Sequence, residues 1–400
     1  MSTFYDAHVH IMNFDYVNFT PLLYSVFESG ASSLTSGFFS SSYINPQTGK
    51  LTANFANTLS RFQEPIKSTI FSMEEDLKGH LGHKNSFVSE DGKFHFRGKT
   101  YDAYALVPLC MDFSSAPNNR PYYNIPYRDK ITYFAEKTLE QIAIYKSENP
   151  NTIFRFYPFL GINPEVHSKE KIKSLLERFF LGKESERFYG VKFYPPLGTD
   201  PWPIDDKEKW EKVELIYSFL EEHNLPLTTH CDNQGFRVIE TKDAWKFTDP
   251  LSWKYAIEKH PKLRVNFAHF GRFYSNTTRF LDKVATLSKT AELSISHSEW
   301  MKTIIDFIEK YDNVYTDLSF SLMDKTFVNA VSTYLLNGEK NKLFSRIIFG
   351  SDFSINLLKI DSYNSYLKNY ENAPFRDDFV SLSVEDNAEA FLGFEKSKDE

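Results

Sequence analysis

Short apolar runs alternate with longer amphipathic stretches along most of this chain. Eight runs are almost continuously apolar, as strands buried on both faces are: residues 5–11, 104–111, 153–160, 188–194, 225–230, 263–270, 314–319 and 346–352. The stretches between them have helical spacing, for example at 129–148, 169–180, 207–223, 299–311 and 325–336. This alternation predicts an α/β fold, a (β/α)8 TIM barrel whose chemistry lies at the carboxyl ends of the strands.

One interval breaks the alternation. Residues 13–100 separate the first two predicted strands and are too many for one βα connection. They include a helix-like piece at 73–81 and a hairpin signal at Asp91-Gly92. Because the segment leaves the barrel at its catalytic end, we predict a single domain over residues 1–400 with a large insertion after strand 1. Residues 13–100 would form a subdomain or lid over the active-site mouth.

Aromatic residues are frequent in this segment. Phe38, Phe39 and Tyr43 suit the wall of an apolar pocket. Aromatic-rich surfaces are also common where subunits meet, so a homodimer contact is the alternative role. His80, His83 and His95 are interpreted as surface or packing residues rather than as metal ligands.

Polar residues end the predicted strands with unusual regularity. The first strand carries His8 and His10, which strand alternation places on one face. The other residues of this kind are Lys192, His230, His269 and Asp352. Imidazoles with one carboxylate suit a divalent ion, most simply Zn²⁺, with an open position for water. Such an ion lowers the pKa of its water, and a carboxylate can then take the proton.

Several of these strand-end segments resemble a known family. They are residues 6–10, 190–195, 268–271, 315–319 and 350–352, together with 107–113 and the tail 386–393. They are similar to the amidohydrolase superfamily, above all to the amidohydrolase-related branch with its aminocarboxymuconate semialdehyde decarboxylase-like and lactonase-like enzymes. The resemblance covers nearly the whole chain except residues 13–100. It implies a metal-dependent barrel enzyme.

The resemblance also implies roles for single residues. His8, His10, His230 and Asp352 match metal ligands, and Asp352 also contacts the metal water. His269 matches a histidine that acts catalytically beside that water. We therefore expect a divalent metal, most simply Zn²⁺, with His269 and Asp352 as the catalytic pair.

Four further residues leave alternatives open. Lys192 lies near the place of a carboxylated lysine that bridges two metals in other members, or it stays inside the barrel beside an acid or a substrate group. Arg272 suits a substrate carboxylate, or it is a solvated loop arginine. Asp317 can fix the tautomer of a ligand histidine or cap a helix. Cys231 points away from the ligand face and is interpreted as packing.

Composition narrows the class of protein. A net charge of −7 argues against a nucleic-acid partner, and no apolar run approaches the roughly 20 residues of a membrane span. The two cysteines, Cys110 and Cys231, exclude a disulfide framework, and no signal peptide precedes the first predicted strand. These features favour a cytoplasmic protein that acts on a small molecule.

Two enzyme classes fit this site. The leading hypothesis is a metal-dependent hydrolase that uses a metal-activated water on a small carboxylated amide, ester or lactone. The alternative is a metal-dependent non-oxidative decarboxylase (lyase) of a small aromatic or muconate-type acid. A barrel that only binds a ligand is disfavoured, because every strand-end residue is retained. No feature of the sequence separates the first two.

Overall fold

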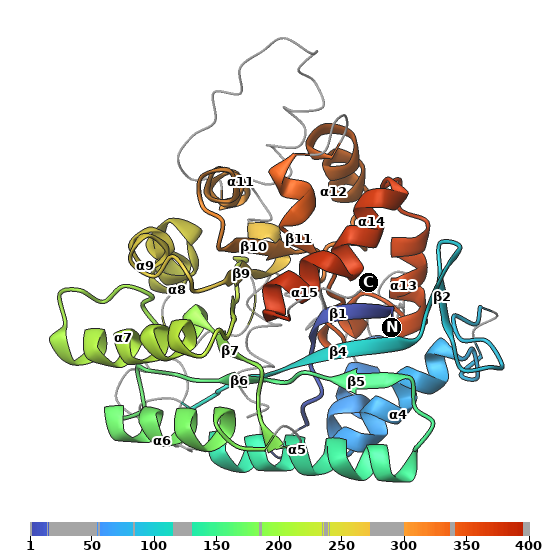
Figure 1. Ribbon diagram of the computed structural model, residues 1–400, viewed down its shortest axis with the longest axis horizontal. Coiled ribbons are helices and arrows are strands. Elements are labelled where there is room, and N and C mark those ends of the chain that lie inside the picture. Colours follow the sequence, from blue (N-terminus) through green and yellow to red (C-terminus); the bar gives the residue numbers. More distant parts are fainter. Residues whose placement is uncertain are drawn as a thin grey trace, which may run out of the picture.

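Eight parallel strands form the centre of the molecule (Figure 1). The computed structural model describes residues 2–13, 15, 54, 57–82, 85–114, 130–183, 186–233, 235, 239, 241–272, 300–336 and 341–394. The strands follow one another around the sheet as β1 (Thr3–Val9), β4 (Ala103–Cys110), β6 (Phe159–Gly161), β7 (Gly190–Phe193), β8 (Leu227–Thr229), β9 (Val265–Phe267), β10 (Val314–Asp317) and β11 (Ile347–Ile348). All eight predicted strands are therefore confirmed.

The last strand returns to the first. The backbone N–H of Ala7 donates to the carbonyl of Phe349 over 3.0 Å, and the N–H of Asp352 donates to the carbonyl of His8 over 2.8 Å. These bonds join the ends of the sheet, so the predicted TIM barrel is confirmed. They also bring the polar residues of the first and last strands side by side.

Helices cover the outside of the barrel. They are α4 (Ile66–Leu77), α5 (Ile131–Glu148), α6 (Lys169–Phe180), α7 (Lys207–Glu222), α8 (Thr241–Thr248), α9 (Lys254–Lys259), α11 (Trp300–Lys310), α12 (Lys325–Ala330), α13 (Tyr363–Glu371), α14 (Asp377–Val384) and α15 (Asp386–Leu392). Ser168 and Asp206 cap α6 and α7 by accepting backbone N–H groups of the first turn. Among the described helices, none combines the length and the apolar content that crossing a membrane requires.

Short helical turns complete the framework. They are η2 (Pro195–Leu197), η3 (Pro250–Trp253), η4 (Ala268–Gly271), η5 (Val331–Leu335), η6 (Lys342–Ser345) and η7 (Ile355–Leu358). The predicted helix at 325–336 is divided between α12 and the π-helical turn η5. Both η2 and η4 follow barrel strands directly, so they shape the rim on which the polar residues lie.

One predicted strand is divided in two. Residues 153–160 form β5 (Phe154–Phe156), which pairs with the start of β4, and then β6, which pairs with its end. Pro158 lies between the two pieces and has no N–H to donate to a sheet. The interruption therefore has a local cause that the apolar pattern alone does not show.

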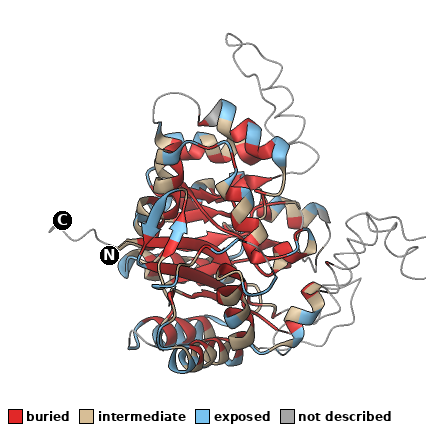
Figure 2. Cartoon of the chain, turned by 90° about the vertical axis from the view of Figure 1, so that its right-hand side faces the viewer, coloured by how far each residue is buried: buried red, intermediate tan, exposed pale blue. Residues whose placement is uncertain are grey.

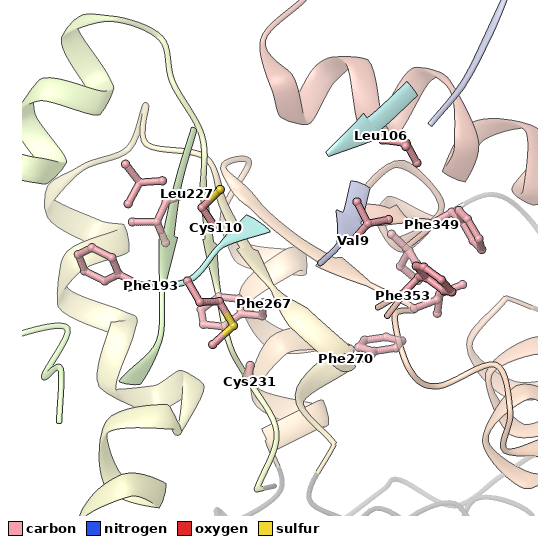
Figure 3. Close-up of a cluster of buried hydrophobic side chains, with 14 of the residues drawn as sticks. Val9, Leu106, Cys110, Phe193, Leu227, Cys231, Phe267, Phe270, Phe349 and Phe353 are labelled. Carbon is pink, nitrogen blue, oxygen red and sulfur yellow. The ribbon is translucent and has the colours of Figure 1, made fainter. Parts of the chain in front are cut away.

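Apolar side chains fill two layers. The larger layer lies between strands and helices and includes Phe193, Leu227 and Phe267, which Figure 3 shows in one cluster. A smaller layer, which includes Ala7 and Phe159, fills the inside of the barrel. The strands are buried almost throughout, whereas the helices present mixed faces (Figure 2).

The described part of residues 13–100 includes a helix and a hairpin. Helix α4 packs against α5 and α13, in the place of an ordinary barrel helix. The hairpin of β2 (Phe94–Phe96) and β3 (Lys99–Tyr101) packs on Phe4, whose ring centroid lies 4.8 Å from that of Phe94. Gly92 makes the predicted turn just before this hairpin, because its N–H donates to Ser89 over 2.9 Å.

The remainder of that segment includes Phe38, Phe39 and Tyr43, which lie outside the described residues. The lid and the homodimer contact therefore both stay predictions.

Candidate metal centre

Three donor atoms, one at the end of β1 and two just after β1 and β11, converge on one point. The Nε2 atoms of His8 and His10 lie 3.3 Å apart, and they lie 3.2 and 3.1 Å from Oδ1 of Asp352. All three side chains are buried. A divalent ion with bonds of about 2.1 Å holds neighbouring donors about 3.0–3.4 Å apart. This donor triangle (His8, His10, Asp352) therefore fits a divalent metal in both spacing and chemistry.

A bulge in β1 turns both histidines inward. The pairing of β1 with β4 shifts register between Asp6 and Val9, so strict alternation is broken there. Ala7 points into the barrel with the inner apolar layer, and the extra residue allows His8 to point inward as well. The sequence correctly predicts that His8 and His10 share a face, but not the bulge that puts this face inside.

Outer partners fix the two rings. Nδ1 of His8 lies 3.0 Å from Oδ2 of Asp317, and Nδ1 of His10 lies 3.1 Å from the carbonyl oxygen of Leu109. With these nitrogens engaged, each ring directs Nε2 toward Asp352, as outer partners of metal-binding histidines do. Asp317 therefore orients a candidate ligand, and among the helices that the structure describes none is capped by its side chain.

His230 and His269 belong to a second group, together with Asp232. Their candidate ligand atoms lie within 4.8 Å of one another, and Nε2 of His230 is 3.1 Å from Oδ1 of Asp232. The His269 ring centroid lies 5.0 Å from those of both His8 and His230, so His269 connects the two groups. The structure therefore places His230 beside Asp232 rather than in the donor triangle, and the four-ligand set stays a prediction.

Two of the predicted catalytic residues have a strained backbone. His269 and Asp352 both have φ of 60°, in the left-handed region that residues other than glycine rarely adopt. Each such residue costs about 1–3 kcal/mol and persists only when its surroundings hold it. Here the N–H of His269 donates to Oδ1 of Asp317 over 2.9 Å, and the N–H of Asp352 is held by β1. Strain of this kind is common at functional sites.

Ser319 joins the candidate ligands to their support, and sequence reasoning missed it. Its hydroxyl lies 3.1 Å from Nδ1 of His8 and 2.8 Å from Nδ1 of His269, and it also donates to Asp317. The position of Ser319 was the available signal, because it ends the strand predicted over 314–319 and lies two residues after Asp317, a spacing that places both on one face of a strand.

Burial and charge set the protonation of this cluster. Burial alone would raise the pKa of Asp352, but hydrogen bonds from His10 and His8 lower it well below its usual value. Burial lowers the pKa of His10, and it lowers the pKa of His269 to about 4. Burial also opposes charge on His8, but the Asp317 carboxylate outweighs it and raises the pKa of His8. The cluster thus combines ionised carboxylates with imidazoles, which is a donor set for a cation.

Lys192 lies inside the barrel on β7. It is buried, and its Nζ has no hydrogen-bond partner within the described part of the chain. Burial lowers its pKa to about 8, against the opposing effect of the Asp317 and Asp352 carboxylates. An acid hydrogen-bonded to this lysine, one of the predicted settings, is therefore not observed.

Arg272 is buried and already paired. Its Nη2 lies 2.6 Å from Oδ2 of Asp324, and its guanidinium lies 4.9 Å from the ring centroid of Phe327. The alternative of a solvated loop arginine is therefore wrong, whereas binding of a substrate carboxylate stays a prediction. Cys231 is fully buried, and burial raises the pKa of its thiol well above the usual value, in agreement with a packing role.

Replacing the outer partner of His8 tests this arrangement. We expect Asp317→Asn to weaken metal binding by about 10- to 100-fold while leaving the number of sites unchanged, because the ring of His8 loses its anchor. Titration of the metal-free protein with Zn²⁺ or Mn²⁺ measures the affinity. Asp312→Asn, at a side chain that is 89% exposed, serves as the control. Equal affinities in the two variants would contradict the role of Asp317.

Comparisons with known proteins agree with this class of site. The family model described as "Amidohydrolase" matches residues 155–394, which is more than half of the chain. The chain therefore belongs to the amidohydrolase family. No curated protein is similar to it by sequence.

Solved structures of similar fold span nearly the whole chain. A 5-carboxyvanillate decarboxylase from Novosphingobium aromaticivorans has a TM-score of 0.51 at 11% identity, over 98% of this chain and 97% of its own. A probable 2-pyrone-4,6-dicarboxylic acid hydrolase from Acinetobacter baumannii has a TM-score of 0.49 at 12% identity, over 98% and 99%. The first of these likenesses shows a shared fold, and the second supports no further conclusion.

Proposed function

We propose that this chain is a metal-dependent, non-oxidative decarboxylase of a small hydroxylated aromatic acid. The observation that carries the proposal is the near full-length correspondence with 5-carboxyvanillate decarboxylase, at a TM-score of 0.51. It favours the decarboxylase, the alternative of the sequence analysis, over the hydrolase. The buried donor triangle supports the same proposal, since loss of CO2 from an acid is aided by a site that excludes water.

The metal would be held by His8, His10 and Asp352, with His230 as the predicted fourth ligand. A divalent ion at these donors would supply positive charge that stabilises the negative charge of the reacting acid. Imidazole and carboxylate donors suit Zn²⁺, the ion expected from the sequence, and Mn²⁺ as well. The crystal of 5-carboxyvanillate decarboxylase contains manganese, so reconstitution with each ion is needed to identify the metal.

His269 is the proposed proton carrier. When the bond to the carboxylate breaks, CO2 leaves, its electron pair remains on the ring carbon, and a proton must reach that carbon. Nδ1 of His269 is held by Ser319, which leaves Nε2 to exchange the proton. Burial lowers the pKa of His269 to about 4, so the resting ring is neutral near pH 7 and would take up a proton during the reaction before it passes that proton to the ring carbon.

A hydrolase is the second candidate, and one observation favours it. Asp352 is ionised and touches both histidines of the donor triangle. A carboxylate in that position could accept the proton of an attacking water, as hydrolysis of an amide, ester or lactone requires. The family description "Amidohydrolase" points in the same direction.

Product analysis separates the two reactions. The protein, loaded with Mn²⁺ or Zn²⁺, is incubated with hydroxybenzoates, 5-carboxyvanillate and muconate-type acids. We expect one CO2 released per acid consumed, and no release from metal-free protein. Proton release from a parallel panel of lactones, esters and amides, without CO2 from any acid, would overturn the decarboxylase and favour the hydrolase.

A further inference from the structure

Lys192 is a buried lysine that belongs neither to the donor triangle nor to the partners that orient it. Its neighbours on β7, Val191 and Phe193, belong to the apolar layer between strands and helices. Strand alternation therefore directs Lys192 into the barrel. It is 2% exposed, and its Nζ has no hydrogen-bond partner among the residues that the structure describes. Burying an ammonium without a partner lowers the stability of the folded protein. Its presence here therefore indicates a ligand that pairs with it.

The surroundings of Lys192 connect it to the donor triangle. In register, Lys192 pairs with Thr228 on β8, which pairs in turn with Asn266 on β9. The amide nitrogen of Asn266 donates to Oδ2 of Asp317 over 2.8 Å, and that same oxygen holds His8. Lys192 therefore lies in the polar layer that supports the candidate ligands.

The charges around Lys192 favour an anionic ligand at this position. Asp232, Asp317 and Asp352 act on Lys192 electrostatically, but no hydrogen bond joins any of them to its Nζ. Two of these carboxylates are already engaged with His8. The three N–H groups of the lysine are thus left for a group that enters the site. An ammonium can donate hydrogen bonds but cannot accept them, and its strongest hydrogen bonds are to anionic oxygens.

We propose that the Lys192 ammonium binds the carboxylate of an acidic substrate and is a specificity-determining residue rather than a metal ligand. The identity of that acid rests on the proposed function, whereas the capture of a carboxylate does not. The contact exists in the bound acid and is lost as CO2 departs. It stabilises bound substrate at least as much as the transition state, so removing it should raise KM and leave kcat unchanged or higher.

Formate, the smallest carboxylate, is the probe for the main experiment. Calorimetric titration of manganese-loaded protein with formate compares wild type with Lys192→Met. We expect the variant to bind formate about 10- to 100-fold more weakly, the usual loss for a hydrogen bond to a charged group. Unchanged affinity, which is expected if only water fills this layer, would overturn the proposal. Absence of formate binding to the wild type would overturn it as well.

Lys212→Met is the matched control. Lys212 is also a buried lysine, but it lies on α7 outside the barrel, where its Nζ is 2.8 Å from Oε1 of Glu208. This variant should bind formate as the wild type does. Lys192→Arg keeps the positive charge and should restore part of the affinity that Lys192→Met loses. An equal loss in Lys212→Met or no recovery in Lys192→Arg would count against the assignment.

Metal affinity distinguishes the ammonium from a carboxylated lysine. Removing a positive charge beside a cation site should leave metal binding as tight as in the wild type or tighter. If Lys192 carried CO2 and bound the metal, Lys192→Met would weaken metal binding instead, which would overturn the proposal. Because an unpaired buried charge does not stabilise the fold, the variant should remain folded. If Lys192→Met and Lys192→Gln both unfold, the lysine is structural and the proposal is wrong.

The outcomes keep this inference separate from the proposed function. If no acid releases CO2 while formate binding still depends on Lys192, the decarboxylase is wrong and the carboxylate site stands. If CO2 is released and Lys192→Met binds formate as tightly as the wild type, the proposed function stands and the role proposed for this lysine is wrong.

Discussion

The substitution His8→Ala is expected to reduce metal affinity by more than about 100-fold. His8 contributes one of three donors that lie 3.1–3.3 Å apart, so its loss opens the donor triangle. Even the loss of an outer partner of a ligand costs about 10- to 100-fold, and the loss of a donor should cost more. Equilibrium dialysis with metal analysis measures the effect, and His80→Ala, at an exposed side chain, is the control.

His230→Ala is the informative companion variant. If His230 completes the metal site, as the sequence predicts, this variant should lose affinity as His8→Ala does. If it keeps the full metal content, the ion is held by the donor triangle alone, and His230 acts with Asp232, 3.1 Å away. A full metal complement in His8→Ala itself would remove the assignment of the triangle.

Much of the fold could be predicted from the sequence, because strands buried on both faces have a plain signature. All eight strands lie where the apolar pattern predicts them, and so do the helices predicted between residues 129 and 336. The pattern failed where local chemistry interrupts it. Pro158 divides one predicted strand into two pieces, which pair with the start and the end of β4. An apolar run indicates that a segment is buried. It does not indicate that the segment is interrupted where a proline lacks the N–H that a sheet requires.

The candidate site was predictable as a set of residue types but not as a geometry. His8, His10 and Asp352 meet because the last strand pairs with the first, a contact across nearly the whole chain. The partner of His230 depends instead on the turn just after β8, where Asp232 comes back against the ring. Hydroxyl contacts such as those of Ser319 leave no strong mark in a sequence, since serine is common at turns and strand ends.

The second large effect is expected from His269→Asn. The substitution keeps a polar side chain of similar reach but removes the titratable ring, so turnover should fall by about 10²- to 10⁴-fold, equivalent to about 3–5 kcal/mol of barrier. Metal content should stay near that of the wild type, because His269 lies outside the donor triangle. The measurement is CO2 release or hydrolysis by the metal-loaded variant, whichever reaction the wild type performs.

The comparison of turnover with metal content decides what His269 does. His223→Asn, at an exposed position after α7, should match the wild type in both respects. If His269→Asn instead loses its metal, His269 is a ligand, and an ion shared among His230, Asp232 and His269 becomes the better model. If it keeps both metal and turnover, the proton is carried by another group. The Ser319 hydroxyl, 2.8 Å from Nδ1 of His269, fixes the ring in either case, so Ser319→Ala should weaken whichever role the first variant reveals.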